Sequence, residues 1–187
     1  MKKHIITVAG DLASGKGTVT KLLGDDLGYE IYRNGEYFRK LAKEKNMGVT
    51  EFNEYVTEHP EIDREIEFSA SEYARKHDNL IVDARLGWYA VPESFKVYIK
   101  VDTDEAARRA FNDEKRKDTE NFNTIEEHKQ DIIKRFNLEN ERYFNLYNVR
   151  KDDMDNYDFV IDSTDKTPLE VKELILLEYN NWLRERD

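Results

Sequence analysis

The stretch Gly10–Thr18, which reads GDLASGKGT, lies between the apolar run Ile5–Ala9 and a segment with helical periodicity. A glycine-rich turn at such a junction aims several backbone N–H groups at one point, and the positive end of the helix dipole adds to them. The positions of Gly10, Gly15 and Lys16 match the pattern G-x-x-x-x-G-K in the strand-to-helix context that this pattern requires. The stretch therefore predicts a phosphate-binding loop over residues 10–18.

Within this loop, Lys16 is expected to reach the β and γ phosphates of a bound nucleoside triphosphate and to neutralise charge on the transferred group. Gly17 occupies the position at which Ser or Thr usually binds magnesium, and Thr18 follows it. We therefore expect Thr18 to act on Mg²⁺ through water. Asp83, at the end of a short apolar run, is the carboxylate expected to hold the metal or its water shell.

Length and composition limit the classes of protein that fit. The chain has 187 residues, enough for one core, and predicts a single domain over residues 1–187. Its net charge of −10 opposes nonspecific binding to nucleic acid or to an anionic membrane. The absence of cysteine excludes disulfides and thiolate metal sites, and no run approaches the roughly 20 apolar residues of a membrane span. We expect a monomeric cytoplasmic protein that binds small molecules.

Short apolar runs alternate with longer segments of helical periodicity, which favours parallel strands joined by crossover helices in three layers. The expected strands are Ile5–Ala9, Tyr29–Tyr32, Leu80–Asp83, Lys96–Val101 and Phe159–Ile161. The expected helices are Gly15–Leu27, Glu36–Lys45, Thr50–Thr57, Pro60–Lys76, Glu105–Lys115, Thr124–Asn148 and Pro168–Arg184. The fold class is therefore an α/β protein with a five-stranded parallel sheet flanked by helices.

The remaining motifs distinguish a kinase from a nucleotide-dependent switch. A common GTP switch needs Asp-x-x-Gly after the third strand, but DARLG has Leu86 at the glycine position, and the guanine-reading pattern N-K-x-D is absent. Guanidinium groups clamp a second phosphate well, and two arginines seven residues apart project from one helix face. The arginines with suitable positions are Arg39, Arg64 and Arg85 near the sheet edge, and Arg135 and Arg142 on one helix. This distribution favours a kinase.

Six segments resemble, in this order, the cytidylate kinases, most closely the compact type typical of archaea and also found in bacteria. The segments are ITVAGDLASGKGT, NGEYFRKLA, EFNEYVTEHPEIDREI, IVDARLGW, KRFNLENERYFNLY and YDFVIDST. The resemblance covers essentially the whole chain and implies a P-loop nucleoside monophosphate kinase that transfers the γ-phosphoryl group of ATP to CMP or dCMP. It also implies an acceptor-binding segment at about residues 33–77 and a lid at about residues 112–140. Two alternatives stay open: a P-loop kinase of another nucleoside monophosphate or small acceptor, and an inactive nucleotide-binding regulator.

Individual roles follow from this resemblance by position. The catalytic residues would be Lys16, Arg135 and Arg142, and the acceptor-binding residues Gly35, Arg39, Asp63, Arg64 and Arg85, with Asp63 and Arg64 at the base or ribose. The ATP-binding residues would be Gly10, Asp11, Leu12, Ala13, Ser14, Gly15, Lys16, Gly17, Thr18 and Arg109, and the metal would lie near Asp83 and Thr18. Arg135 and Arg142 are expected to stand apart from the site until nucleotides bind, because clustered positive charges repel one another.

Several positions depart from the family pattern. Ala13 replaces a loop glycine, which is tolerated if the position keeps ordinary backbone dihedrals, and Asp11 adds a carboxylate that weakens anion binding unless it points away. In the lid pattern R-x-x-x-R, Arg109 fills the first place and Asp113 the second, with Lys115–Arg116 as substitutes from a shifted register. These departures widen the range of acceptors to be considered.

Overall fold

The computed structural model describes residues 3–113 and 122–186 and is built on one sheet of five parallel strands. The strands lie in the order β2-β3-β1-β4-β5. Their bounds are β1 (Ile5–Gly10), β2 (Glu30–Arg33), β3 (Leu80–Asp83), β4 (Phe95–Lys100) and β5 (Phe159–Asp162). The predicted fold class and all five predicted strands are confirmed, with ends that differ by at most one residue.

The register of the sheet brings the glycine-rich loop next to the end of β3. Val8 of β1 lies opposite Asp83 of β3, and Gly10 lies opposite Ile99 of β4. Because β1 has β3 on one side and β4 on the other, the chain connections run in opposite directions on its two sides. The crevice at the carboxyl ends of strands at such a point is where open α/β sheets bind ligands.

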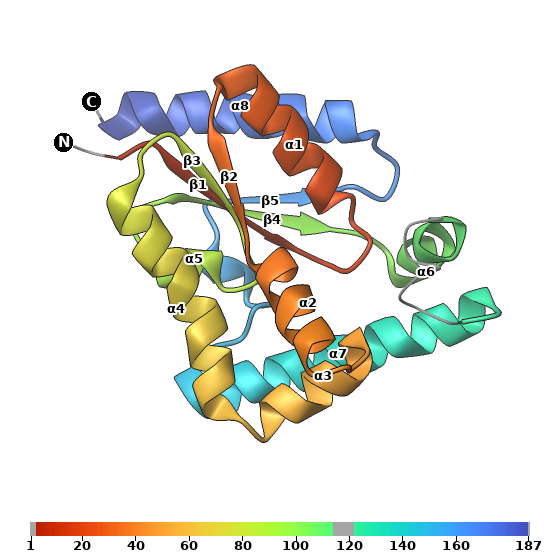
Figure 1. The fold of residues 1–187 in the computed structure, drawn as a ribbon. Coiled ribbons are helices and arrows are strands. Elements are labelled where there is room, and N and C mark those ends of the chain that lie inside the picture. Colours follow the sequence, from red (N-terminus) through yellow and green to blue (C-terminus); the bar gives the residue numbers. More distant parts are fainter. Residues whose placement is uncertain (1–2, 114–121, 187) are drawn as a thin grey trace.

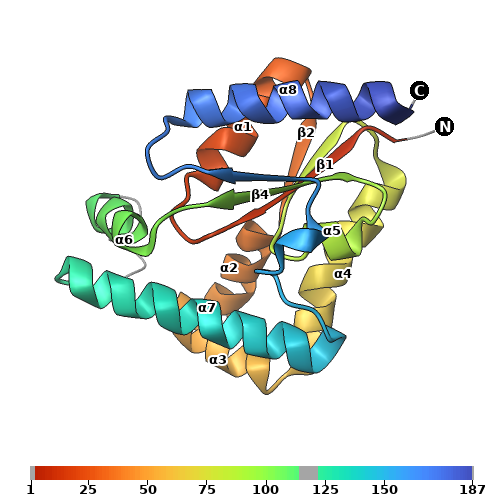
Figure 2. The same cartoon turned by 180° about the vertical axis from the view of Figure 1, so that it is seen from behind.

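Helices cover both faces of the sheet. On one face α1 (Lys16–Leu27) packs against α8 (Pro168–Arg186), over a core that includes Leu23, Ile175 and Tyr179. The other helices lie on the opposite side and around the carboxyl edge (Figures 1 and 2). They are α2 (Asn34–Glu44), α3 (Val49–Thr57), α4 (Pro60–Lys76), α5 (Gly87–Ala90), α6 (Thr103–Asn112) and α7 (Ile125–Tyr147). The central strands β1 and β3 are buried on both faces and therefore appear in the sequence as nearly continuous apolar runs.

The helices predicted from periodicity are present, with two short additions. Neither α5 nor the 3-10 helix Met154–Asn156 was expected, because three or four residues are too few to show a helical period. The expected helix Glu105–Lys115 is α6, which begins earlier, at Thr103, and ends at Asn112. The basic pair Lys115–Arg116, expected as a substitute in the lid, lies outside the described residues. Among the described helices, none is long and apolar enough to cross a bilayer.

Helix α7 runs across the molecule below the sheet in the view of Figure 2. It begins with a capping box, in which the Thr124 hydroxyl accepts a hydrogen bond from the N–H of Glu127 at 3.1 Å. Its 23 residues extend for about 34 Å, packing against α6 near the start and against α3 further along. The side chains of one helix can therefore reach both the loop region and the segment between β2 and β3.

Candidate active site

The phosphate-binding loop lies tightly against β4, and two of its glycines are needed for that shape. A Cβ atom at Gly10 would lie 2.6 Å from the carbonyl oxygen of Ile99, so no other residue fits there without a shift of the backbone. Gly15, at the N-cap of α1, has φ of 82°, which only glycine adopts at low cost. The loop backbone then leads directly into the first turn of α1, where its N–H groups and the helix dipole favour an anion.

The structure resolves both loop departures. The Asp11 carboxylate accepts hydrogen bonds from the Tyr98 hydroxyl at 2.6 Å and from the Val101 N–H at 3.0 Å, so its charge is directed at β4 and away from α1. This satisfies the condition under which Asp11 leaves anion binding intact.

Ala13 does not keep ordinary dihedrals, because its φ is 60°. A left-handed conformation costs a residue with a Cβ about 1–2 kcal/mol, so the loop is strained at this position.

Lys16 and Asp83 form an ion pair at the base of the loop. The Arg33 Nε atom lies 4.0 Å from the Asp83 carboxylate. Desolvation lowers the pKa of Lys16 to about 7, and the charges of Arg85, Arg33 and Arg39 act in the same direction. Cationic groups from α1, β2, α2 and the end of β3 thus converge on one position, as a site for two phosphate groups requires.

The residues around Asp83 fit a magnesium ion held mainly by phosphate oxygens and water. Asp83 supplies one carboxylate at the end of β3, and Mg²⁺ is usually bound through one or two carboxylates together with substrate phosphates and water. The hydroxyl that approaches Asp83 is that of Thr20, at 3.5 Å from Oδ2, whereas Thr18 is exposed in the first turn of α1. Sequence reasoning missed Thr20, although its position four residues after Lys16 places it on the same face of the helix.

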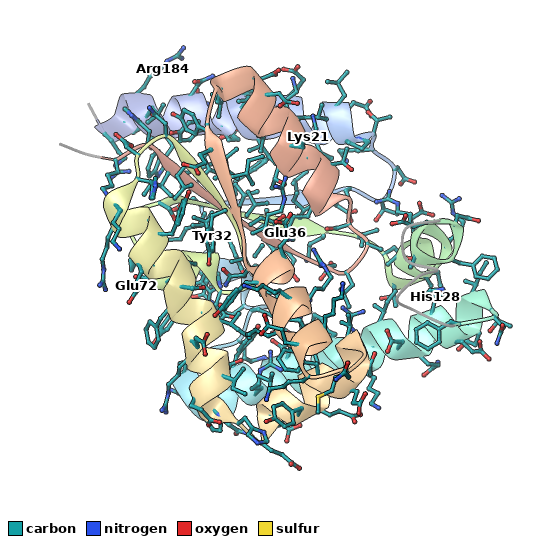
Figure 3. All side chains as sticks on the ribbon, viewed as in Figure 1. Lys21, Tyr32, Glu36, Glu72, His128 and Arg184 are labelled. Atoms are coloured by element: carbon teal, nitrogen blue, oxygen red, sulfur yellow. The ribbon has the colours of Figure 1, made fainter. Side chains whose placement is uncertain are left out.

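On the acceptor side, Gly35 and Arg39 lie one turn apart on α2. A Cβ atom at Gly35 would lie 3.3 Å from Nη1 of Arg39, so the missing side chain leaves room for the guanidinium group. Arg39 itself is exposed, and Figure 3 shows the neighbouring Glu36 at the start of α2, beside the carboxyl edge of the sheet. The glycine therefore has a specific neighbour in the candidate acceptor clamp.

Asp63 and Arg142 meet in the interior between α4 and α7. The Arg142 Nε atom lies 2.7 Å from Oδ1 of Asp63, and the Tyr147 hydroxyl donates to Oδ2 at 2.6 Å. Arg142 also donates to the side-chain oxygen of Asn53 on α3 at 3.3 Å. Asp63, expected at the base or ribose, thus positions Arg142, and Arg64, expected beside it, is exposed on α4.

Glu67, one turn after Asp63, is a buried carboxylate that sequence reasoning missed. Its two oxygens accept hydrogen bonds from Asn34 Nδ2 at 3.4 Å and from the Tyr143 hydroxyl at 3.3 Å. Burial and the charge of Asp63 raise the pKa of Glu67 to about 7, although Arg142 and Arg85 oppose this. The i, i+4 spacing of the two acidic residues was the available signal for a shared buried face.

A second buried carboxylate, Glu139 on α7, also escaped the sequence reasoning. Its Oε2 atom lies 2.8 Å from Nε of Arg85 and also pairs with Lys151. Although burial opposes ionisation, the charges of Arg85, Lys151, Arg135 and Arg142 lower the pKa of Glu139 to about 2. Glu139 is therefore ionised throughout the physiological range.

These carboxylates bear on the repulsion that was expected among the clustered cations. Arg135 Nη1 lies 3.5 Å from Oδ2 of Asp131, and both arginines are buried. The protein supplies its own counter-charges in Asp63, Asp131 and Glu139, which reduce that repulsion. That Arg135 and Arg142 stand apart from the nucleotide site until nucleotides bind stays a prediction.

Arg109, expected at the ATP, is attached to the segment after β5. It donates to the carbonyl oxygens of Ser163 at 2.8 Å and Thr164 at 3.0 Å, and its Nε atom pairs with Glu105 at 2.7 Å. The Ser163 hydroxyl in turn donates to the carbonyl oxygen of Ser14 at 3.0 Å. Arg109 is thereby linked to the phosphate-binding loop through one intervening residue.

A glycine-rich loop at a sheet switch point, with a lysine, a strand-end aspartate and converging arginines, defines a P-loop phosphotransferase. Residues 5–165 match the model of the cytidylate kinase-like family, and the chain belongs to this family, as its resemblance indicated. It is 34% identical over 176 residues to the cytidylate kinase of Thermoplasma volcanium, and the aligned region covers 91% of this chain and 88% of that protein. It is 36% identical over 163 residues to that of Methanosarcina barkeri, covering 84% and 86% respectively.

Solved structures support the same fold. A gluconokinase from Sinorhizobium meliloti aligns with a TM-score of 0.63 at 11% identity, covering 98% of this chain and 95% of that one. The shikimate kinase of Aquifex aeolicus aligns with a TM-score of 0.54 at 19% identity, covering 95% and 96%. These identities establish the fold alone. The family and the relatives named cytidylate kinase identify the chain as an ATP-dependent phosphotransferase with nucleoside monophosphate kinase activity.

Proposed function

We propose that this enzyme transfers the γ-phosphoryl group of ATP to CMP or dCMP. The observation that carries the proposal is the convergence of Lys16 with Arg39 and Arg85, which places cations from the phosphate-binding loop and from the acceptor segment around one position. Relatives named cytidylate kinase, 34% and 36% identical over most of the chain, support the choice of acceptor.

On the ATP side, the loop N–H groups and Lys16 hold the β and γ phosphates, and Arg109 contributes through the segment after β5. Asp83, with the Thr20 hydroxyl beside it, would hold the water shell of Mg²⁺. The metal ion would supply positive charge that neutralises the phosphates. Lys16, which pairs with Asp83 in this structure, supplies the protein's own cation to the transferred group.

On the acceptor side, Arg39 and Arg85 clamp the phosphate of the monophosphate, while Arg135 and Arg142 stabilise charge on the transferring group. No general base is required, because phosphoryl transfer is accelerated mainly by positioning and charge stabilisation. Asp63 holds Arg142 in the orientation that this role needs. Gly35 keeps the space in which the Arg39 guanidinium lies.

A coupled ADP-release assay with CMP, dCMP, UMP, AMP and GMP in parallel tests the proposal. We expect kcat/KM to be highest for CMP or dCMP, and Lys16→Ala to reduce turnover by about 10³-fold while the protein stays folded. A higher kcat/KM for another acceptor would replace the proposed one. ATP binding without transfer to any of the five would contradict the proposal and leave a kinase of another small acceptor or an inactive regulator.

We also propose that the protein acts as a monomer in the cytoplasm, on small nucleotides and not on nucleic acid or membranes. Its net charge of −10 opposes binding to polyanions. Size-exclusion chromatography with light scattering, with and without nucleotides, measures the mass directly. A stable dimer at micromolar concentration would contradict this part of the proposal.

A further inference from the structure

Glu139 lies at the centre of the cationic cluster and is completely buried. Its Oε2 atom pairs with both Arg85 and Lys151, whereas Oε1 has no hydrogen-bond partner among the described residues. The charges of Arg135 and Arg142 also act on it, and its own charge acts on Lys16. One carboxylate therefore faces cations from the loop, from the end of β3, from α7 and from the segment after α7.

This arrangement creates a conflict with phosphate binding. Arg85 is a candidate for the acceptor clamp, yet its Nε atom is bound to a protein anion at 2.8 Å. If the guanidinium group moved fully to a substrate phosphate, a carboxylate with no other partner would be left uncompensated, which is strongly unfavourable in the interior. Lys151 removes this obstacle, because it is buried beside Glu139 and pairs with the same oxygen.

We propose that Glu139 is a positioning residue that holds Arg85 in the empty site and yields it to the acceptor phosphate. Lys151 keeps the Glu139 carboxylate paired after the exchange. The inference rests on the proposed kinase function and assigns roles to two residues beyond the phosphate-contacting set.

Arg85 can pass from Glu139 to the acceptor phosphate without losing all of its hydrogen bonds at once. An arginine has five N–H donors in a rigid fork, so the pairing of Nε with Glu139 leaves the terminal nitrogens able to approach phosphate before the first contact breaks. Glu139 meanwhile prevents the cations around it from repelling one another, which allows the cluster to be assembled before substrate arrives. Such preorganised charge lowers the barrier without reorganisation during transfer.

Glu139 is not placed as a proton acceptor. Its carboxylate is ionised and surrounded by cations that hold its pKa at about 2, far below that of an effective base near neutral pH. Its effect is transmitted through the orientation of Arg85. Variants at this position should therefore separate binding of the acceptor from turnover, which a purely structural ion pair would not do.

Two variants test the exchange. Lys151→Met leaves Arg85 as the only direct partner of Glu139 in the described part of the chain, so we expect the acceptor KM to rise at least about tenfold while the ATP KM stays within about threefold. Adding Glu139→Gln removes the anion that retains Arg85, so the double variant should recover the wild-type acceptor KM. Its kcat should stay at least about tenfold below wild type, because Arg85 is no longer oriented.

The matched controls are Lys134→Met and Glu141→Gln, which make the same changes at exposed positions of α7 and should leave both constants unchanged. Near-UV circular dichroism and thermal unfolding establish that each variant is folded. If Glu139→Gln does not fold, the Lys151→Met arm still decides. An acceptor KM within threefold of wild type for folded Lys151→Met, or equal changes in both nucleotide constants, would overturn the inference.

A failure of the proposed acceptor is distinguishable from a failure of this inference. The protein is first loaded with a non-hydrolysable ATP analogue, and the binding of inorganic phosphate is then measured by calorimetry. This measurement reports on the Arg85 clamp without phosphoryl transfer. The Lys151→Met variant should weaken that binding and the double variant should restore it, whatever base the true acceptor carries. Unchanged phosphate affinity in both variants would contradict the inference even if CMP is the substrate.

Discussion

Asp63 on α4 and Arg142 on α7 form a buried ion pair with a distance of 2.7 Å between Oδ1 and Nε. The pair joins the segment between β2 and β3 to the long helix below the sheet, and Tyr147 completes the coordination of the carboxylate. Arg142 is thereby held against α4, within the proposed acceptor-binding segment. Its position depends on a counter-charge that the protein supplies.

Replacing that counter-charge should be costly. Asp63→Asn removes the carboxylate that pairs directly with the buried Arg142 guanidinium, so we expect the free energy of unfolding to fall by about 3–5 kcal/mol. Urea denaturation at pH 7 measures the change. Glu72→Gln, an exposed position on the same helix (Figure 3), is the control and should change stability by less than about 0.5 kcal/mol. A similar small effect at Asp63 would show that Arg142 finds another partner.

The close approach of Arg39 to Gly35 predicts a specific defect in acceptor binding. The added Cβ of Gly35→Ala would lie 3.3 Å from Nη1 of Arg39, so the guanidinium group would have to shift slightly. We expect the acceptor KM to rise by about two- to threefold, with the ATP KM unchanged. Gly48→Ala is the matched control, since nothing lies within 4 Å of its added Cβ. Initial-rate kinetics with each nucleotide varied in turn distinguish the two constants.

The left-handed conformation of Ala13 predicts that glycine is the better residue at this position. Ala13→Gly relieves the strain at φ of 60°, and we expect a net gain of about 0.5–1 kcal/mol in the free energy of unfolding after the added entropy of the unfolded chain. Ala110→Gly, within α6, should instead lose about 1 kcal/mol. Denaturant titrations of both variants provide the comparison. A loss of stability at Ala13 would mean that the loop is not strained there.

Glu67 predicts a dependence of stability on pH. Because its pKa is raised from 4.5 to about 7, the folded protein retains a proton on Glu67 that the unfolded chain has released between these values. The contribution of Glu67 to the free energy of unfolding is complete below pH 4.5 and is lost as pH rises through 7. At about 1.4 kcal/mol for each pKa unit, the loss amounts to roughly 3 kcal/mol.

Glu67→Gln stays neutral, so it should lack this loss. The difference in unfolding free energy between the variant and wild type, measured in urea from pH 4.5 to 8, should increase in favour of the variant as pH rises. A constant difference across that range would show that Glu67 titrates alike in the folded and unfolded states.

The sequence determined the fold and the phosphate-binding loop, because both depend on local patterns. Buried parallel strands appear as uninterrupted apolar runs, and the spacing of Gly10, Gly15 and Lys16 records a backbone shape that few other residues permit. Arg39 and Arg85 were also identified as candidates, since each follows a strand at the edge where ligands bind. Their roles toward the acceptor remain proposals.

Only the tertiary structure decided which charges neutralise one another. Asp63 with Arg142, and Glu139 with Arg85, come from segments far apart in the chain, and Lys151 lies beyond the end of α7, so no helical period relates these pairs. The sequence alone does not show whether the Asp11 carboxylate faces a bound phosphate or is held away from it. In the structure it accepts hydrogen bonds from Tyr98 and Val101. The sequence therefore located the cations, whereas the packing of α4 and α7 supplied the buried anions that hold them together, because burying a charge is tolerable only beside its partner.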